Sequence, residues 1–145
     1  MISDVLRDVL ASNAGIVAAL ATYEFTTGAP EVAIFTTERI PDDVNRFPVI
    51  LIVDLSGTPW GTRCKRGAEA FARVMVYGDK NWTLDVIRDI AWDVNRAIDR
   101  VALDSRLAPY GYSAALCQAD PPGYLTDPDG FPGYAIDVRT KILRA

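Results

Sequence analysis

The acidic turn near the C-terminus is the first place in the sequence where chemistry could be expected. In the segment Asp127-Pro-Asp-Gly, one residue separates two carboxylates, as at the start of an EF-hand loop. Such a loop also needs oxygen ligands at later alternating positions, glycine at the sixth and glutamate at the twelfth. The fifth position is Phe131 and the twelfth is Val138, so the pattern predicts no calcium site. Because proline presets φ and glycine tolerates positive φ, we expect a turn that leads into a final strand.

The other acidic residues favour solvated surfaces. Asp42 and Asp43 are adjacent in an expected loop, and Asp85, Asp89 and Asp93 recur at the i, i+4 spacing of one helix face. The chain has no histidine, which removes Ser-His-Asp and Cys-His nucleophile systems, HExxH zinc sites and histidine bases. We therefore expect no catalytic residue, no metal, no cofactor and no enzyme activity. An enzyme that relies on carboxylates and tyrosine is the least favoured alternative.

A basic cluster and two cysteines lie outside these acidic segments. Arg63, Lys65 and Arg66 fall in an expected long exposed loop, residues 56–67, whose SGTPWG segment lacks the GxxxxGK[ST] pattern of a phosphate loop. The cluster is either solubilising charge or a contact to phosphates, including passing DNA, or to an acidic partner. Cys64 and Cys117 have no metal or redox spacing, which indicates free thiols in a cytoplasmic product.

The composition predicts one globular domain over residues 1–145. Half of the residues are apolar and 23% are charged, which is typical of a soluble protein. The net charge of −4 argues against a dedicated nucleic-acid binder. No apolar run reaches the ~18–20 residues of a membrane helix, and the first residues lack the pattern of a signal peptide, so we expect no membrane association.

The first half of the chain begins with helical periodicity. A helix over 3–13 is expected to be capped by Ser3 or Asp4 and ended by Asn13. The remaining expected elements of this half are a short helix at 14–21, a loop at 22–30, a short strand at 32–36 and a strand at 47–55 with both faces covered.

The second half predicts strands on either side of a long helix. The strand at 68–78 has a small face suited to close helix packing, and a bulky face with Phe71, Met75 and Tyr77 directed to solvent or another subunit. A helix over 83–103 carries Trp92 on its charged face, where it either packs on a neighbouring loop or arginine or anchors another chain. Strands at 110–122 and 134–143 follow. The order predicts an α+β two-layer sandwich, a mainly antiparallel sheet with two main helices packed on one face.

Several segments, in order, resemble the tail completion, or tail terminator, proteins of long-tailed phages and phage-like gene-transfer particles. VLRDVLASNAGIVAALA is similar to the opening helical segment of that family, and AIFTTERIPDDVNRFPVILIV to its short strand, loop and apolar strand. AFARVMVYGDKNWTLDVIRDIAWDVNRAID resembles its strand and long helix, and DPDG precedes a final strand as in its usual ending. The likeness covers nearly the whole chain but includes no catalytic signature.

The resemblance implies a structural virion protein at the tail or neck, assembled in the bacterial cytoplasm. Such proteins form a hexameric ring at the head-proximal end of the tail tube, stop its polymerisation and join it to the head connector, while DNA passes through the lumen without sequence-specific binding. The alternatives are a connector or stopper protein of the neck, and an α+β sensor domain that binds a small ligand. The residues expected to contact neighbouring subunits, tube or connector are Trp60, Arg63, Lys65, Arg66, Phe71, Met75, Tyr77, Trp92, Asp129 and Phe131.

Overall fold

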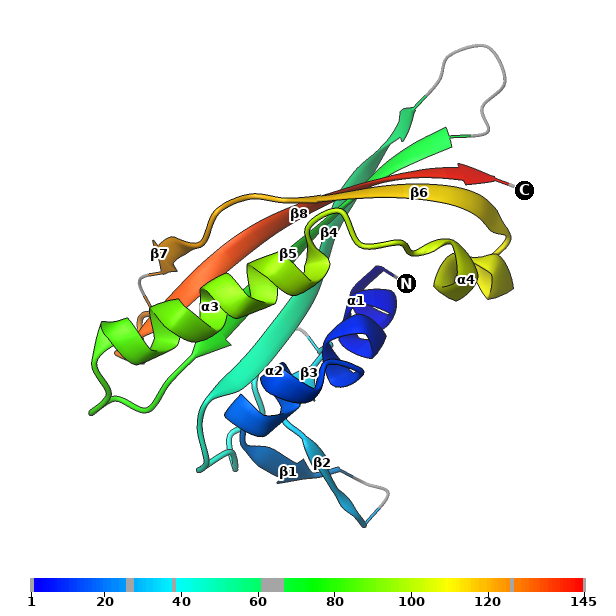
Figure 1. Ribbon diagram of the computed structural model, residues 1–145. Helices are drawn as coiled ribbons and strands as arrows, with labels where there is room; N and C mark the ends of the chain where they lie inside the picture. Colours follow the sequence, from blue (N-terminus) through cyan, green and yellow to red (C-terminus); the bar gives the residue numbers. More distant parts are fainter. Residues whose placement is uncertain (1, 26–27, 38, 61–66, 126, 145) are drawn as a thin grey trace.

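Three long antiparallel strands form the centre of a six-stranded sheet (Figure 1). They are β4 (Val49–Trp60), β5 (Gly67–Tyr77) and β8 (Gly133–Arg144). The sheet order is β3-β4-β5-β8-β6, and β7 also pairs with β8. β3 (Ile34–Phe35) runs parallel to β4, whereas β6 (Tyr112–Ala119) and β7 (Gly123–Leu125) are antiparallel to β8.

The remaining elements are four α-helices, one 3₁₀ helix and a small hairpin. The helices are α1 (Ile2–Ala11), α2 (Ala14–Ala19), α3 (Leu84–Ile98), α4 (Asp104–Leu107) and η1 (Ala108–Tyr110), and the hairpin pairs β1 (Thr22–Glu24) with β2 (Pro30–Val32). This computed structural model describes residues 2–25, 28–37, 39–60, 67–125 and 127–144, except for the side chains of 56–60, 113–115 and 144.

The two longest helices, α1 and α3, lie on the same face of the sheet (Figure 1). Alternate strand residues point to this face and are buried against the helices. The sheet contributes Ile50, Ile52, Ala72, Val74, Val76, Cys117, Ile136, Val138 and Ile142 to this main core. The helices contribute Val5, Leu6, Val9, Leu10, Ile87, Ala91, Val94 and Ile98. The predicted α+β two-layer sandwich and the small, helix-facing side of β5 are confirmed.

A second, smaller core covers part of the opposite face. Ala33, Phe35, Val49 and Leu51 are buried there beneath β1 and the segment that leads into β4. The parallel β3–β4 pair places this segment over the sheet. The expectation that the first half of β4 is covered on both faces is confirmed, because Val49 and Ile50 are both fully buried.

Two of the three residues expected to cap the first helix, Ser3 and Asn13, have other roles. Asn13 does not end α1 in a left-handed conformation; it is the N-cap of α2, and its side-chain oxygen accepts a hydrogen bond from the Ile16 N–H at 3.2 Å. Ser3 lies inside α1 and donates to Asp54 of β4, from its hydroxyl at 2.8 Å and its N–H at 2.9 Å. The Ser3 hydroxyl, which could have capped the helix locally, therefore binds the carboxylate of Asp54, a residue distant in sequence.

Three predicted boundaries were wrong. The segment 22–30 was expected to be a loop, but it contains β1 and the first residue of β2, which pair as a hairpin. In the expected loop at 56–67, the described residues 56–60 and 67 are strand, since β4 and β5 stay paired as far as Trp60 and Gly67, with a register shift between Leu55 and Thr58. Pairing with a long neighbour overrides the local turn signals.

The helix expected to reach residue 103 ends at Ile98. Asp99 accepts a hydrogen bond from the Ala119 N–H at 3.0 Å, and Arg100, at φ 58°, donates its own N–H to the Cys117 carbonyl at 2.9 Å. These two contacts attach the end of α3 to β6 and redirect the chain.

Candidate functional site

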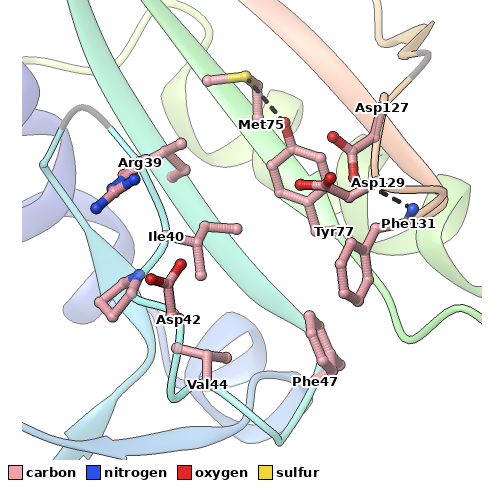
Figure 2. A pocket seen from close by; sticks show the side chains of 12 residues that line it. Arg39, Ile40, Asp42, Val44, Phe47, Met75, Tyr77, Asp127, Asp129 and Phe131 are labelled. Carbon is pink, nitrogen blue, oxygen red and sulfur yellow. Dashed lines mark hydrogen bonds between the residues drawn. The ribbon is translucent and has the colours of Figure 1, made fainter.

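A pocket of about 450 Å³ opens on the face of the sheet that the helices leave free. Its floor is formed by Leu51 of β4 and by Met75 and Tyr77 of β5. Residues 39–47 form one wall, and the turn at 127–131 forms the other (Figure 2). The two walls are far apart in sequence, and the adjacent strands β4, β5 and β8 bring them together.

Hydrogen bonds shape both walls. In the first wall, the Val44 N–H donates to the Pro41 carbonyl at 3.2 Å, and the Tyr23 hydroxyl donates to Asp43 at 2.8 Å. In the second wall, Gly130 has φ 84° and closes the predicted Asp-Pro-Asp-Gly turn by donating to the Asp127 carbonyl at 3.0 Å. The turn before β8 is therefore confirmed.

Aromatic rings join the two walls at the rim of the pocket. Phe47 and Phe131 stack with their ring centroids 5.3 Å apart and their planes inclined by 27°. Lys80 places its ammonium 4.9 Å from the centroid of the Phe131 ring, which is cation–π distance. The Phe131 N–H also donates to the Asp127 carboxylate at 3.2 Å. One ring of the rim, that of Phe131, thus already contacts a cation.

Tyr77 closes the floor with its ring half-buried. Its hydroxyl donates to the Met75 sulfur at 3.4 Å (Figure 2). Burial, and secondly the negative charge of Asp127, raises the pKa of Tyr77 above its ordinary value, so the hydroxyl stays protonated at neutral pH. A Cβ on Gly133 would lie 2.9 Å from the Tyr77 ring, so glycine at this position makes room for the ring.

The pocket carries an excess of negative charge. Asp42, Asp127 and Asp129 line it together with a single cation, Arg39. In Figure 2, Asp42 lies across the pocket from Asp127 and Asp129. Within the part of the chain that the structure describes, Asp42 and Asp129 take part in no ion pair. The arrangement of carboxylates and aromatic rings is suited to a cationic group.

Four of the predicted contact residues meet in this pocket: Met75, Tyr77, Asp129 and Phe131. The expectation that the bulky face of β5 is free holds only in part, because Met75 and Tyr77 pack on the smaller core of their own chain. Phe71 lies further along the same face of β5 and is half-buried. Trp92 lies on α3, on the other side of the sheet, and 37% of its surface is exposed.

The remaining predicted contact residues belong to the β4–β5 hairpin. Trp60 is the last residue of β4 and pairs with Gly67, but its side chain is outside the described part of the structure. Arg63, Lys65 and Arg66 lie outside the described residues altogether.

Arg39, Asp42 and Phe47 were not predicted to belong to this site. Asp42 was interpreted as a solvated loop residue, and it is indeed exposed. Its position over the sheet depends on the parallel pairing of β3 with β4, a long-range contact that no local pattern encodes. The only available signal was the apolar character of Ile40, Val44 and Phe47, which pack on the smaller core.

Beyond the pocket, the same face of the sheet has exposed apolar and charged side chains. Arg73 of β5 and Asp137 of β8 form an ion pair at 2.8 Å across the middle of the face. Leu55, Leu116 and Leu143 are exposed by 42%, 48% and 38%, and the strand register places them on this face. We call the part of this face that includes Leu55, Phe71, Arg73, Leu116, Asp137 and Leu143 the open face.

The described residues contain neither a cluster of metal ligands nor a membrane-spanning helix. No group of three or more cysteine, aspartate or glutamate side chains is placed to hold a metal ion. None of the described helices has the length and apolar character needed to cross a membrane.

Comparison with known proteins identifies the family. The family model described as tail completion protein gp17 matches residues 6–143, nearly the entire chain. No curated protein matches the chain significantly. The match agrees with the resemblance found in the helical opening, the Phe-Pro strand and the long amphipathic helix, and it gives the chain a structural role in the phage tail. The chain therefore belongs to the tail completion protein gp17 family of phages.

Proposed function

We propose that this protein forms a hexameric ring at the head-proximal end of the tail tube, where it ends tube polymerisation and joins the tube to the head connector. Membership of the family establishes the broader role, a structural protein of tail completion that associates with other components of the virion tail. The ring, the connector joint and the passage of DNA through the lumen are part of the proposal, as is the absence of enzyme activity.

The observation that carries the ring proposal is the open face. It combines exposed leucines with charged side chains on four adjacent strands, β4, β5, β8 and β6. A surface of this kind suits burial against another protein. The helix-covered side has a different chemistry, with Trp92 between charged residues of α3. Two unlike surfaces on one chain favour heterologous contacts, which close into a ring when the rotation permits.

We assign the contacts in this assembly to the residues that the sequence singled out. Phe71 lies on the open face, Trp92 lies on α3, and the pocket residues Met75, Tyr77, Asp129 and Phe131 lie beside the open face. Trp60 is the last residue of β4, and Arg63, Lys65 and Arg66 follow it in the sequence. The tube and connector proteins are the proposed partners above and below the ring.

A matched pair of variants tests the open face. Leu116 on β6 and Val86 on α3 have nearly equal exposure, 48% and 49%, but lie on opposite sides of the sheet. Leu116→Glu is expected to reduce the assembled fraction of purified protein, alone or on tail tubes, by at least about tenfold, whereas Val86→Glu, which replaces none of the assigned contact residues, is expected to reduce it less. Light scattering and electron microscopy of tail ends measure both. Wild-type protein that never assembles, even on tubes, contradicts the ring.

Imaging of particle necks separates this function from that of a neck stopper or connector protein. The proposal expects the protein directly on the last ring of the tube. A position on the head side, separated from the tube by another protein, supports the neck alternative.

The pocket favours one further candidate, binding of a small ligand, because its volume falls in the range of ligand sites. A saturable thermal shift with small cationic amines, in a protein that stays monomeric, would support that candidate over the ring.

A further inference from the structure

We propose that the acidic pocket of one subunit receives the basic tip of the β4–β5 hairpin, residues 61–66, from the next subunit. The inference deepens the proposed ring and depends on it. It names a contact that would hold neighbouring copies together, and the pocket residues that would make it.

Charge complementarity is the first argument. The tip has the sequence Gly-Thr-Arg-Cys-Lys-Arg, with three cations and no acidic residue. The pocket is lined by three carboxylates and one guanidinium, with the Lys80 ammonium at its rim, and Asp42 and Asp129 have no ion-pair partner among the described residues. A chain with a net charge of −4 therefore concentrates cations in the tip and carboxylates in the pocket. Opposite charges on two surfaces steer association and fix its register.

The aromatic rim is the second argument. Guanidinium groups stack on aromatic faces and form paired hydrogen bonds with carboxylates. Phe47 and Phe131 provide the faces, and Asp127 and Asp129 are on the same wall as Phe131. The ammonium of Lys80 already lies over Phe131, so this rim has the geometry for binding a cation. Apolar side chains alone would not distinguish a basic tip from any other loop.

The length of β4 is the third argument, because it places the two described ends of the hairpin, Trp60 and Gly67, far from the pocket of their own subunit. Leu51 is in the pocket floor and Trp60 is the last residue of the strand. At the ~3.3 Å rise per residue of a strand, these two residues are about 30 Å apart. β4 and β5 stay paired as far as Trp60 and Gly67, and Gly67 pairs with Leu143 near the end of β8. Residues 61–66 join these two strand ends, and half of this segment spans at most ~10 Å when fully extended, so we expect the complementary charges to meet between copies, in a heterologous contact.

Disulfide trapping tests the contact directly. The tip contains a native cysteine, Cys64, while Cys117 is fully buried. An Asp129→Cys variant is expected to form a ladder of disulfide-linked multimers on mild oxidation of assembled protein. The ladder must vanish when Cys64→Ser is added. Asp89→Cys, which places an exposed thiol on α3, is the matched control and is expected to give no ladder. A ring preparation in which Asp129→Cys does not link to Cys64 overturns the proposal.

Charge reversal gives an independent test. Asp42→Lys with Asp129→Lys makes the pocket basic, and Arg63→Asp with Lys65→Asp and Arg66→Asp makes the tip acidic. Each variant alone is expected to assemble at least about tenfold less than wild type, because its own tip and pocket then repel. A one-to-one mixture is expected to assemble, since each tip then finds an opposite pocket in an alternating ring. Urea unfolding of each variant confirms that it remains folded.

The outcomes distinguish this inference from the proposed function. Rings that form equally well from each reversed variant retain the proposed function and overturn the tip-in-pocket contact. The same is true if reversed variants fail alone and also fail as a mixture, since the tip and pocket then bind different partners, such as DNA or the connector. Wild-type protein that forms no ring under any condition removes the proposed function itself.

Discussion

The ring of Phe131, in the turn before β8, stacks on the ring of Phe47, in the segment before β4, with 5.3 Å between the centroids. This contact joins the two walls of the pocket across the end of the sheet (Figure 2). Neither wall is part of a long element, so their separation depends on side-chain contacts of this kind.

The stacked pair is expected to be energetically coupled. Phe47→Ala and Phe131→Ala should each lower the free energy of unfolding, and a double-mutant cycle should give a coupling of about 0.5–1.5 kcal/mol. Urea denaturation of the wild type, both single variants and the double variant measures it. If the free-energy costs of the two single substitutions simply add, other contacts hold the two walls in place.

Asp54 should make the attachment of α1 to β4 depend on pH. Burial acts to raise the pKa of this carboxyl, but hydrogen bonds that include both donated by Ser3 outweigh burial and leave the pKa below its ordinary value. A lowered pKa stabilises the folded state above the unfolded pKa of ~4, and the stabilisation is lost as the pH falls through the folded pKa.

We therefore expect Asp54→Asn to lower the free energy of unfolding by about 1 kcal/mol at neutral pH, since the carboxylate is partly exposed. The difference from wild type should shrink as the pH falls below about 4. Urea denaturation at several pH values checks this, with the exposed Asp89→Asn as control. A cost that does not change with pH would mean that the charge of Asp54 contributes nothing.

Asn95 of α3 fixes the end of β6. Its side-chain amide donates to the Asp120 carbonyl at 2.8 Å, and Asn95 is 9% exposed. Asn95→Ala leaves that carbonyl without its donor and should cost about 1–2 kcal/mol of unfolding free energy. Arg96→Ala, which removes an exposed ion pair with Asp93, should cost less than about 0.5 kcal/mol. Equal costs would contradict the anchoring role.

Cys117 should be unreactive in the folded protein. Burial raises its pKa to about 11, against the opposing effect of the Thr140 hydroxyl, which donates to the sulfur at 3.9 Å. The raised pKa keeps the thiol protonated throughout the neutral range, and the thiolate is the reactive form. In a Cys64→Ser background, a colorimetric thiol reagent at about pH 8 should label nothing until denaturant is added. Rapid labelling of native protein would show that β6 opens readily.

The sequence determined the elements whose periodicity is strong. The stripe of Ile87, Ala91 and Val94 predicted α3, and the small face of β5 predicted the helix-covered side of the sheet. Both signals are local, because a helix or strand repeats its buried side chains at a fixed spacing. The absence of histidine and the acidic turn directed the interpretation away from catalysis, and the order of segments indicated the tail completion family.

Only the tertiary structure decided where the pocket lies and which residues form it. Met75, Tyr77, Asp129 and Phe131 were singled out one by one, but their convergence with Asp42 and Phe47 depends on strand order and on the parallel β3–β4 pair. The end of α3 at Ile98 and the true roles of Ser3 and Asn13 depend likewise on partners elsewhere in the fold. Such contacts join residues distant in sequence, and no local spacing encodes which strand will lie beside which.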